Sequence, residues 1–242
     1  VNTTVDLSDN KKLTKLILDN KPDDFPLFLY AQHFPSQFIE FHCVLDSTLI
    51  EDQSLLPLYH IFNELFSMPM KDGDELLSFE DVVTKLKTDT VDYHIALGVQ
   101  GTAPDLIDFR LRCKVDKYED AVAWIKHCLF DMVFDENRVS VLLENYVNSI
   151  VELKREGDIM LDSLVNRNLY TERSVKKSVD PLFVEKTLED ILDAIEDGKF
   201  KKEVLPRIEK LRDQLIKQLD RFQIIVLGDM EKIGDTLFNP WV

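Results

Sequence analysis

The chain has 242 residues, of which 45% are hydrophobic and 31% are charged, and its formal net charge is −16. This composition is typical of a soluble globular protein with a substantial core. The negative charge argues against a nucleic-acid partner, because phosphate binding requires clustered Lys and Arg. No apolar run approaches the roughly 20 residues of a membrane span, so we expect no membrane contact.

Cysteine usage indicates the redox compartment. Cys43, Cys113 and Cys128 are an odd number and form no C-x-x-C pair. Each lies among apolar residues, which favours reduced structural thiols in a cytosol-like compartment. A nucleophilic Cys128 beside His127 is disfavoured, because adjacent residues on a helix do not face each other. We expect a cytoplasmic location, while a mitochondrial parent protein stays open because a targeting segment would lie outside this sequence.

Alternating patterns predict strands in the first half of the chain. The clearest runs from 37 to 47, where Ile39 and Phe41 point to one side and Glu40 and His42 to the other. Two later alternating runs, joined by a loop at 100–104, predict an antiparallel hairpin. Strands are thus expected at 27–30, 37–47, 91–99 and 107–115, helices at 11–19, 55–68 and 78–86, and a loop at 68–77.

From Tyr118 onward the apolar periodicity becomes helical. It predicts helices at 118–134, 136–155, 157–169, 179–196 and 202–219. A continuous apolar stretch at 221–229 then predicts a strand of the kind that is buried on both faces. This order predicts an α+β fold, a mostly antiparallel sheet with a block of helices on one face. Residues 27–230 are expected to form one domain, with a linker or the end of a preceding domain at 1–26 and a linker at 231–242.

The segment Leu55–Met68 carries the pattern most informative about function. It is expected to form one amphipathic helix directly after a strand, the setting in which inverted zincins hold zinc through H-x-x-E-H. The corresponding residues here are His60-Ile61-Phe62-Asn63-Glu64. Asn63 stands where the general base belongs, and Glu64 stands where the second His belongs. Because Asn cannot accept and return a proton near neutral pH, the chemistry that activates water is missing.

The order of elements and several local phrases resemble one unit of the pitrilysin/insulinase family of zinc metallopeptidases. The resemblance is strongest to a second, non-catalytic domain in the branch that contains the presequence protease and its cytosolic fungal relatives. It covers roughly 27–229, most of the chain. The phrases that carry it are Pro35–Glu40, Leu56–Tyr59, Phe79–Val83 and the closing strand 220–229.

The resemblance implies a clamshell zinc endopeptidase that encloses and degrades peptides. Its non-catalytic domains form the chamber wall and support the catalytic domain, so the expected partners are other domains of the same polypeptide and the parent's peptide substrates. No catalytic or cofactor-binding residue is carried over to this chain, and zinc is expected in the parent's catalytic domain. Because the sequence begins at Val1 without Met, we expect it to be a piece of that longer protein.

The alternative to a motif without function is a residual metal site. His60 and Glu64 are expected one turn apart, and Glu144 lies on a later helix, about where the family's third zinc ligand is found. One His and two carboxylates are a chemically reasonable ligand set. The plainer interpretation is a solvated helix face, so the three are weak candidates and we expect no metal in this chain.

Three further groups have a functional and a plain interpretation. His127 and Asp131 lie at i, i+4, which favours a local ion pair over a ligand pair. His42 and His94 project from the polar faces of strands and would meet if those strands were neighbours. They would then be a pair that touches substrate in the chamber, whereas the plain interpretation is two ordinary half-exposed strand histidines. The third group is a basic island in an acidic chain, either a contact for an acidic partner or a solvated loop, made of Arg167, Arg173, Lys176 and Lys177.

Two functions follow as hypotheses. The first is an inactive structural domain of a zinc metalloendopeptidase, a chain that is no enzyme on its own. The alternative is a stand-alone scaffold that binds extended peptides or proteins along a sheet edge by strand addition.

Overall fold

The computed structural model describes residues 7–23, 25, 27–99 and 102–241. Parts of three expected features lie outside the described residues. These are positions 1–6, 24 and 26 of the N-terminal linker, Gln100 and Gly101 of the hairpin loop, and Val242 of the C-terminal linker.

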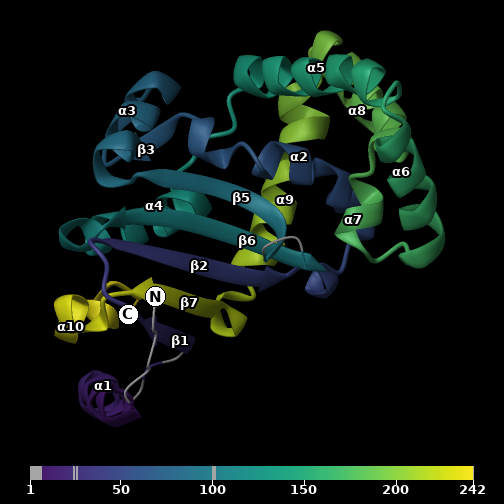
Figure 1. Ribbon diagram of the computed structural model, residues 1–242. Helices are drawn as coiled ribbons and strands as arrows, with labels where there is room; N and C mark the ends of the chain where they lie inside the picture. Colours follow the sequence, from purple (N-terminus) through teal and green to yellow (C-terminus); the bar gives the residue numbers. More distant parts are fainter. Residues whose placement is uncertain (1–6, 24, 26, 100–101, 242) are drawn as a thin grey trace.

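A five-stranded sheet organises the molecule, with the strand order β1-β7-β2-β6-β5 (Figure 1). The pair β1–β7 is parallel, and the pairs β7–β2, β2–β6 and β6–β5 are antiparallel. The predicted α+β class with a mostly antiparallel sheet is therefore confirmed. The strands are β1 (Phe28–His33), β2 (Phe38–Asp46), β5 (Asp92–Val99), β6 (Thr102–Lys114) and β7 (Gln223–Gly228).

A small second sheet interrupts the region that the sequence predicted as a loop. Strands β3 (Met70–Asp72) and β4 (Glu75–Leu77) form a hairpin whose turn contains Gly73 at a φ of 62°. Three residues per strand are too few to display an alternating pattern, which is why the sequence did not reveal them.

The longer helices agree with the predicted positions to within a few residues, and local capping explains several of their starts. Ser78, Asp135 and Asp180 each accept a hydrogen bond from a backbone N–H of the following helix, and Pro181 occupies a first-turn position. The α-helices are α1 (Leu7–Asn20), α2 (Tyr59–Phe62), α3 (Phe79–Asp89), α4 (Tyr118–Phe130), α5 (Glu136–Leu153), α6 (Gly157–Leu169), α7 (Val175–Ser178), α8 (Pro181–Glu196), α9 (Leu205–Ile216) and α10 (Met230–Ile233).

Shorter helical turns join these elements. A π-helical turn, η5 (Phe200–Val204), precedes α9. The 3₁₀ turns are η1 (Ser47–Leu49), η2 (Gln53–Leu58), η3 (Leu65–Ser67), η4 (Val115–Lys117), η6 (Leu219–Arg221), η7 (Gly234–Leu237) and η8 (Asn239–Trp241).

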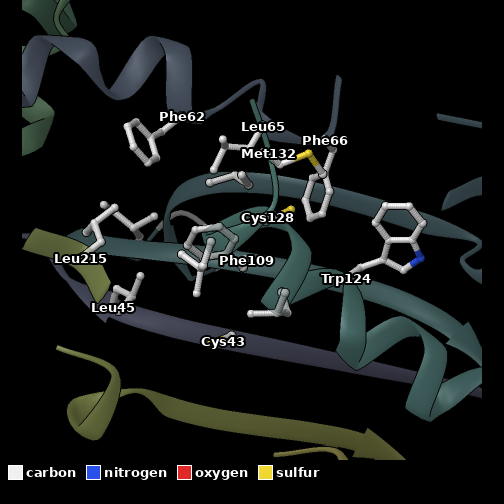
Figure 2. Packing of buried hydrophobic residues seen from close by; sticks show 14 of the residues in the cluster. Cys43, Leu45, Phe62, Leu65, Phe66, Phe109, Trp124, Cys128, Met132 and Leu215 are labelled. Carbon is white, nitrogen blue, oxygen red and sulfur yellow. The ribbon is translucent and has the colours of Figure 1, made fainter. Parts of the chain in front are cut away.

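The core lies between one face of the sheet, here called the covered face, and the helices α4 and α9 behind it (Figure 1). Figure 2 shows Phe109 of β6 packed among Cys128 of α4, Leu215 of α9 and Phe62 of α2. All three cysteines are free and buried, as the apolar setting predicted. Burial raises the pKa of each thiol, to about 12 for Cys113, so these groups stay protonated and inert.

The prediction of one continuous helix over Leu55–Met68 is wrong. The segment consists of η2, the single turn α2 and η3. Beyond Asn63 the backbone bonds become i to i+3, as in Met68 N–H to the Leu65 carbonyl at 3.1 Å. The physical reason is burial. Leu56, Phe66 and Met68 are also buried, which one straight helix with a single apolar stripe would not achieve. That predicted stripe consists of Leu58, Ile61, Phe62 and Leu65.

Two further expectations differ from the structure. Strand β7 is buried on one face only, because Ile224 and Val226 point into the core while Ile225 and Leu227 stay half-buried on the other face. Residues 231–241, expected to form a linker, pack on the core. The Trp241 indole N–H donates to the Tyr118 hydroxyl at 2.8 Å, and its ring contacts Phe41.

Candidate functional site

His60, the first residue of the degenerate motif, is enclosed by two distant elements. Its ring lies against Tyr146 of α5, with ring centroids 3.9 Å apart. Its Nε2 lies 3.2 Å from the Val179 carbonyl oxygen. Because a carbonyl only accepts, Nε2 must carry the proton and offers no lone pair to a metal. Burial lowers the pKa of His60 to about 4, an effect that the Val179 carbonyl only partly opposes.

Glu64 faces a different space. Together with Asn63, Ser67 and His94 it lines a pocket of about 290 Å³ between η3, α3 and the edge strand β5. Burial raises the pKa of the Glu64 carboxyl, and the charge of Arg138 and the Ser67 hydroxyl oppose this shift. The degenerate motif therefore presents a polar pocket beside a strand edge, with an amide and a carboxyl instead of a base and a metal ligand.

Glu144 does not approach His60. It is exposed on α5, where the Ser140 hydroxyl donates to its carboxylate at 2.8 Å. Helix α5 does contact α2, as the sequence suggested, but through Tyr146 instead of Glu144. The three weak metal candidates thus point to three places and do not fit a tetrahedral zinc site. The described residues also contain no other group of three or more His, Cys, Asp or Glu arranged to hold a metal ion.

A second polar site lies on the open face of the sheet, the face opposite the core. In Figure 1 no described helix crosses in front of the centre of β2 and β6. On this face His42 Nδ1 lies 2.7 Å from Asp108 Oδ2, and His42 Nε2 lies 3.3 Å from Glu40 Oε1. The Arg110 guanidinium donates to Glu40 at 3.0 Å. We call Glu40, His42, Asp108 and Arg110 the ionic cluster.

Strand register assembles the ionic cluster. His42 pairs with Arg110 across β2 and β6, and His94 pairs with Arg110 from the other side. Strand β6 therefore separates His42 from His94, and the two histidines do not meet. Alternation in the sequence placed these residues on one face, but no sequence pattern gave the register that joins them.

The ionic cluster is charged and largely buried. Burial acts to lower the pKa of His42, but Asp108 and Glu40 outweigh it and hold the pKa above 6.5. Burial acts to raise the pKa of Glu40, but Arg110 and His42 hold it below 4.5. Asp108 Oδ1 and Arg110 Nε are buried without a hydrogen-bond partner among the described residues. The cluster can therefore accept one further hydrogen bond at Asp108 Oδ1 and donate one at Arg110 Nε.

The remaining candidates have local partners. His127 Nδ1 lies 2.7 Å from Asp131 Oδ2, so the predicted i, i+4 pair forms, with both side chains more than a third exposed. In the basic island, the Arg167 guanidinium lies 4.6 Å from the centre of the Phe183 ring, and Lys177 binds Glu172 at 2.5 Å. Arg173 is exposed. No helix of the described chain is long and apolar enough to cross a membrane.

Comparison with known proteins gives relatives much longer than this chain. No protein-family model matches the sequence. It is 58% identical over 235 residues to the uncharacterized protein YOL098C of Saccharomyces cerevisiae, and the match covers 95% of this chain and 23% of that protein. It is 24% identical over 225 residues to the uncharacterized protein C3H1.02c of Schizosaccharomyces pombe, covering 88% of this chain and 21% of that protein. The chain thus spans about a fifth of the length of these curated relatives.

Among solved structures, the chain is similar to the periplasmic protease PqqL from Escherichia coli. The TM-score is 0.46 at 10% identity, and the match covers 86% of this chain and 21% of that protein.

Proposed function

We propose that this chain is an inactive structural domain of a zinc metalloendopeptidase of the pitrilysin/insulinase type. In this proposal the parent polypeptide encloses peptides in a chamber and degrades them. The present domain forms part of the chamber wall, and a separate catalytic domain carries zinc and the general base. The sequence resemblance and the greater length of the curated relatives support this view.

The proposal rests on the residues that stand in place of the H-x-x-E-H motif. A catalytic domain needs two zinc-binding histidines and a base that activates water. Here Asn63 and Glu64 occupy two of those places, and the third, His60, is held by Tyr146 and the Val179 carbonyl. A histidine that stays neutral in a packed contact supports a structural role. The three free, buried thiols support a reducing compartment, and we infer a cytoplasmic parent.

The chain's own polar surfaces fit a wall that touches substrate without cleaving it. The pocket of Asn63, Glu64 and His94 lies beside the edge strand β5, and the ionic cluster lies on the open face. Both surfaces can orient a peptide through hydrogen bonds. Among the described residues, neither surface brings three His, Cys, Asp or Glu side chains into an arrangement that could hold a metal ion.

Metal content of the purified chain, measured by elemental mass spectrometry after dialysis against a weak chelator, tests the proposal. We expect zinc well below one atom per chain, unchanged by His60→Ala. We also expect no peptidase activity from the chain, and chelator-sensitive activity from the full-length polypeptide. Stoichiometric zinc that is lost in His60→Ala would overturn the proposal.

A second function has its own supporting observation. Strands β1 and β5 lie at the two edges of the sheet. A strand edge presents unpaired N–H and C=O groups to which an extended peptide can add. As a stand-alone scaffold, the chain would bind extended peptides without any dependence on metal. Measurable peptide binding by the 242-residue chain, with no peptidase activity in the full-length polypeptide, would favour this function over the first.

A further inference from the structure

Helix α6 exposes its apolar side to solvent. Leu161, Leu164, Val165 and Leu169 recur at i, i+3, i+4 and i+8, which places them on one side of the helix. Their exposed fractions are 61%, 53%, 42% and 71%. We call these four residues the outer stripe. In a surface helix that serves only its own fold, such a stripe faces the core.

The inner side of α6 combines half-buried Ile159 with polar residues. Ser163 is buried and its hydroxyl donates to Asp180, the capping residue of α8. Ser163 and Asn166 line a small pocket of about 260 Å³ together with Lys176 of α7. Figure 1 shows α6 at the rim of the helical block, beside α7. The inner side of the helix thus makes its contacts within the fold, and the outer stripe remains without a covering element among the described residues.

We propose that the outer stripe of α6 docks against another folded domain of the same polypeptide. The proposal rests on the proposed function, and it adds the surface through which this domain joins its parent. The occupant is inferred from chain length, because this chain spans 23% of a relative with which it is 58% identical. Interfaces between domains of one polypeptide typically bury about 600 to 1,500 Å², so a domain that constitutes about a fifth of a protein is expected to carry a docking surface.

The rim of the stripe fits a protein surface. Asp158 and Asp162 lie along one flank and Arg167 along the other. An apolar centre with a rim of both charges is typical of protein–protein contacts. The chain's charge of −16 opposes a second copy of the same chain and an anionic membrane as occupants. A second copy remains a distinguishable outcome of the experiment below.

Thiol labelling in the full-length polypeptide tests the proposal. Leu161→Cys and Leu164→Cys, made separately, place a reactive thiol in the outer stripe, while the chain's native thiols are buried. Leu76→Cys is the matched control, because Leu76 is 64% exposed and lies in the charged hairpin β3–β4. Maleimide labelling is followed by peptide mass spectrometry without lipid present, and each rate is divided by the rate of the same variant unfolded in guanidinium.

We expect labelling in the outer stripe to be at least tenfold slower than at Leu76→Cys, and independent of protein concentration. Equal rates would show an exposed stripe and overturn the proposal. Protection that appears only at high protein concentration would assign the stripe to a second copy, and would overturn it as well. Peptidase activity is assayed on the same samples: protection without activity refutes only the proposed function, and activity without protection refutes only the docking surface.

Discussion

The two faces of the central sheet bury their side chains by different physical means. The covered face buries apolar groups such as Phe41 and Phe109, which pack against α4 and α9. The open face buries His42 and Asp108 as an ion pair. Apolar burial is favourable in proportion to area, whereas a buried ion pair must first lose its hydration. The covered face therefore stabilises the fold, and the ionic cluster mainly fixes the geometry of the open face.

The largest loss of stability is expected from a substitution in the core on the covered face. Phe109→Ala removes a fully buried ring from the centre of the core and leaves a cavity. We expect the free energy of unfolding to fall by about 3 to 5 kcal/mol, measured by urea denaturation.

Phe28→Ala is the matched control on the open face, since Phe28 is 65% exposed on β1. Its expected effect lies within about 0.5 kcal/mol. A loss of more than about 2 kcal/mol at Phe28 would contradict the distinction between the two faces.

The partly buried His60 and the buried His42 should give opposite pH dependence. His60, on the covered side, has a pKa of about 4 in the folded chain against its ordinary value of 6.5. Between these values the unfolded chain binds more protons, so stability falls as pH decreases from about 6.5 to about 4. The difference corresponds to about 3 kcal/mol. Urea denaturation across this range should show the loss, and His60→Gln should remove it.

His42, on the open face, should make stability depend on pH in the opposite direction. Its folded pKa is raised above 6.5, so its contribution is complete below pH 6.5 and is lost as pH rises through the folded value. His42→Gln should flatten the stability profile above pH 6.5 and leave the loss of stability between pH 6.5 and 4.5, which His60 causes, unchanged. If His42→Gln changed only the profile between pH 6.5 and 4.5, the charged state of the ionic cluster would be refuted.

The sequence predicted the features that follow from local periodicity, such as the two faces of a strand. It did not predict the features that depend on contacts between distant segments, such as strand register. Alternation in 37–47 and 107–115 identified the members of both faces, because successive side chains of a strand point to opposite sides. The register that pairs His42 with Arg110 joins two distant strands and leaves no local pattern. Likewise, the degenerate motif was visible in five consecutive letters. The ring of Tyr146 that encloses His60 comes from a helix whose apolar stripe predicted only core packing.

Removal of one partner from the ionic cluster should have a moderate effect. Asp108→Ala deletes the carboxylate 2.7 Å from His42 and leaves Glu40 as the remaining acidic neighbour of the imidazole. We expect a loss of about 2 kcal/mol at pH 6, the usual range for a buried hydrogen bond to a charged group. The loss should shrink as pH rises through the raised folded pKa of His42, because the imidazole is neutral above that pKa. A loss that stays constant as pH rises would mean that Asp108 contributes through packing alone.

The smallest loss of stability is expected at an exposed ion pair that can be compared directly with His42–Asp108. The pair His127–Asp131 has the same Nδ1 to Oδ2 distance as His42–Asp108, 2.7 Å, but its side chains are 37% and 40% exposed. Water screens the exposed pair and solvates either partner when the other is removed. Asp131→Ala should therefore lower the free energy of unfolding by only about 0.3 kcal/mol, measured as for Asp108→Ala. Because the two pairs share residue types and distance, the difference between the two substitutions reports on burial together with the second contact of His42, to Glu40. Equal losses would show that burial on the open face adds nothing to an ion pair.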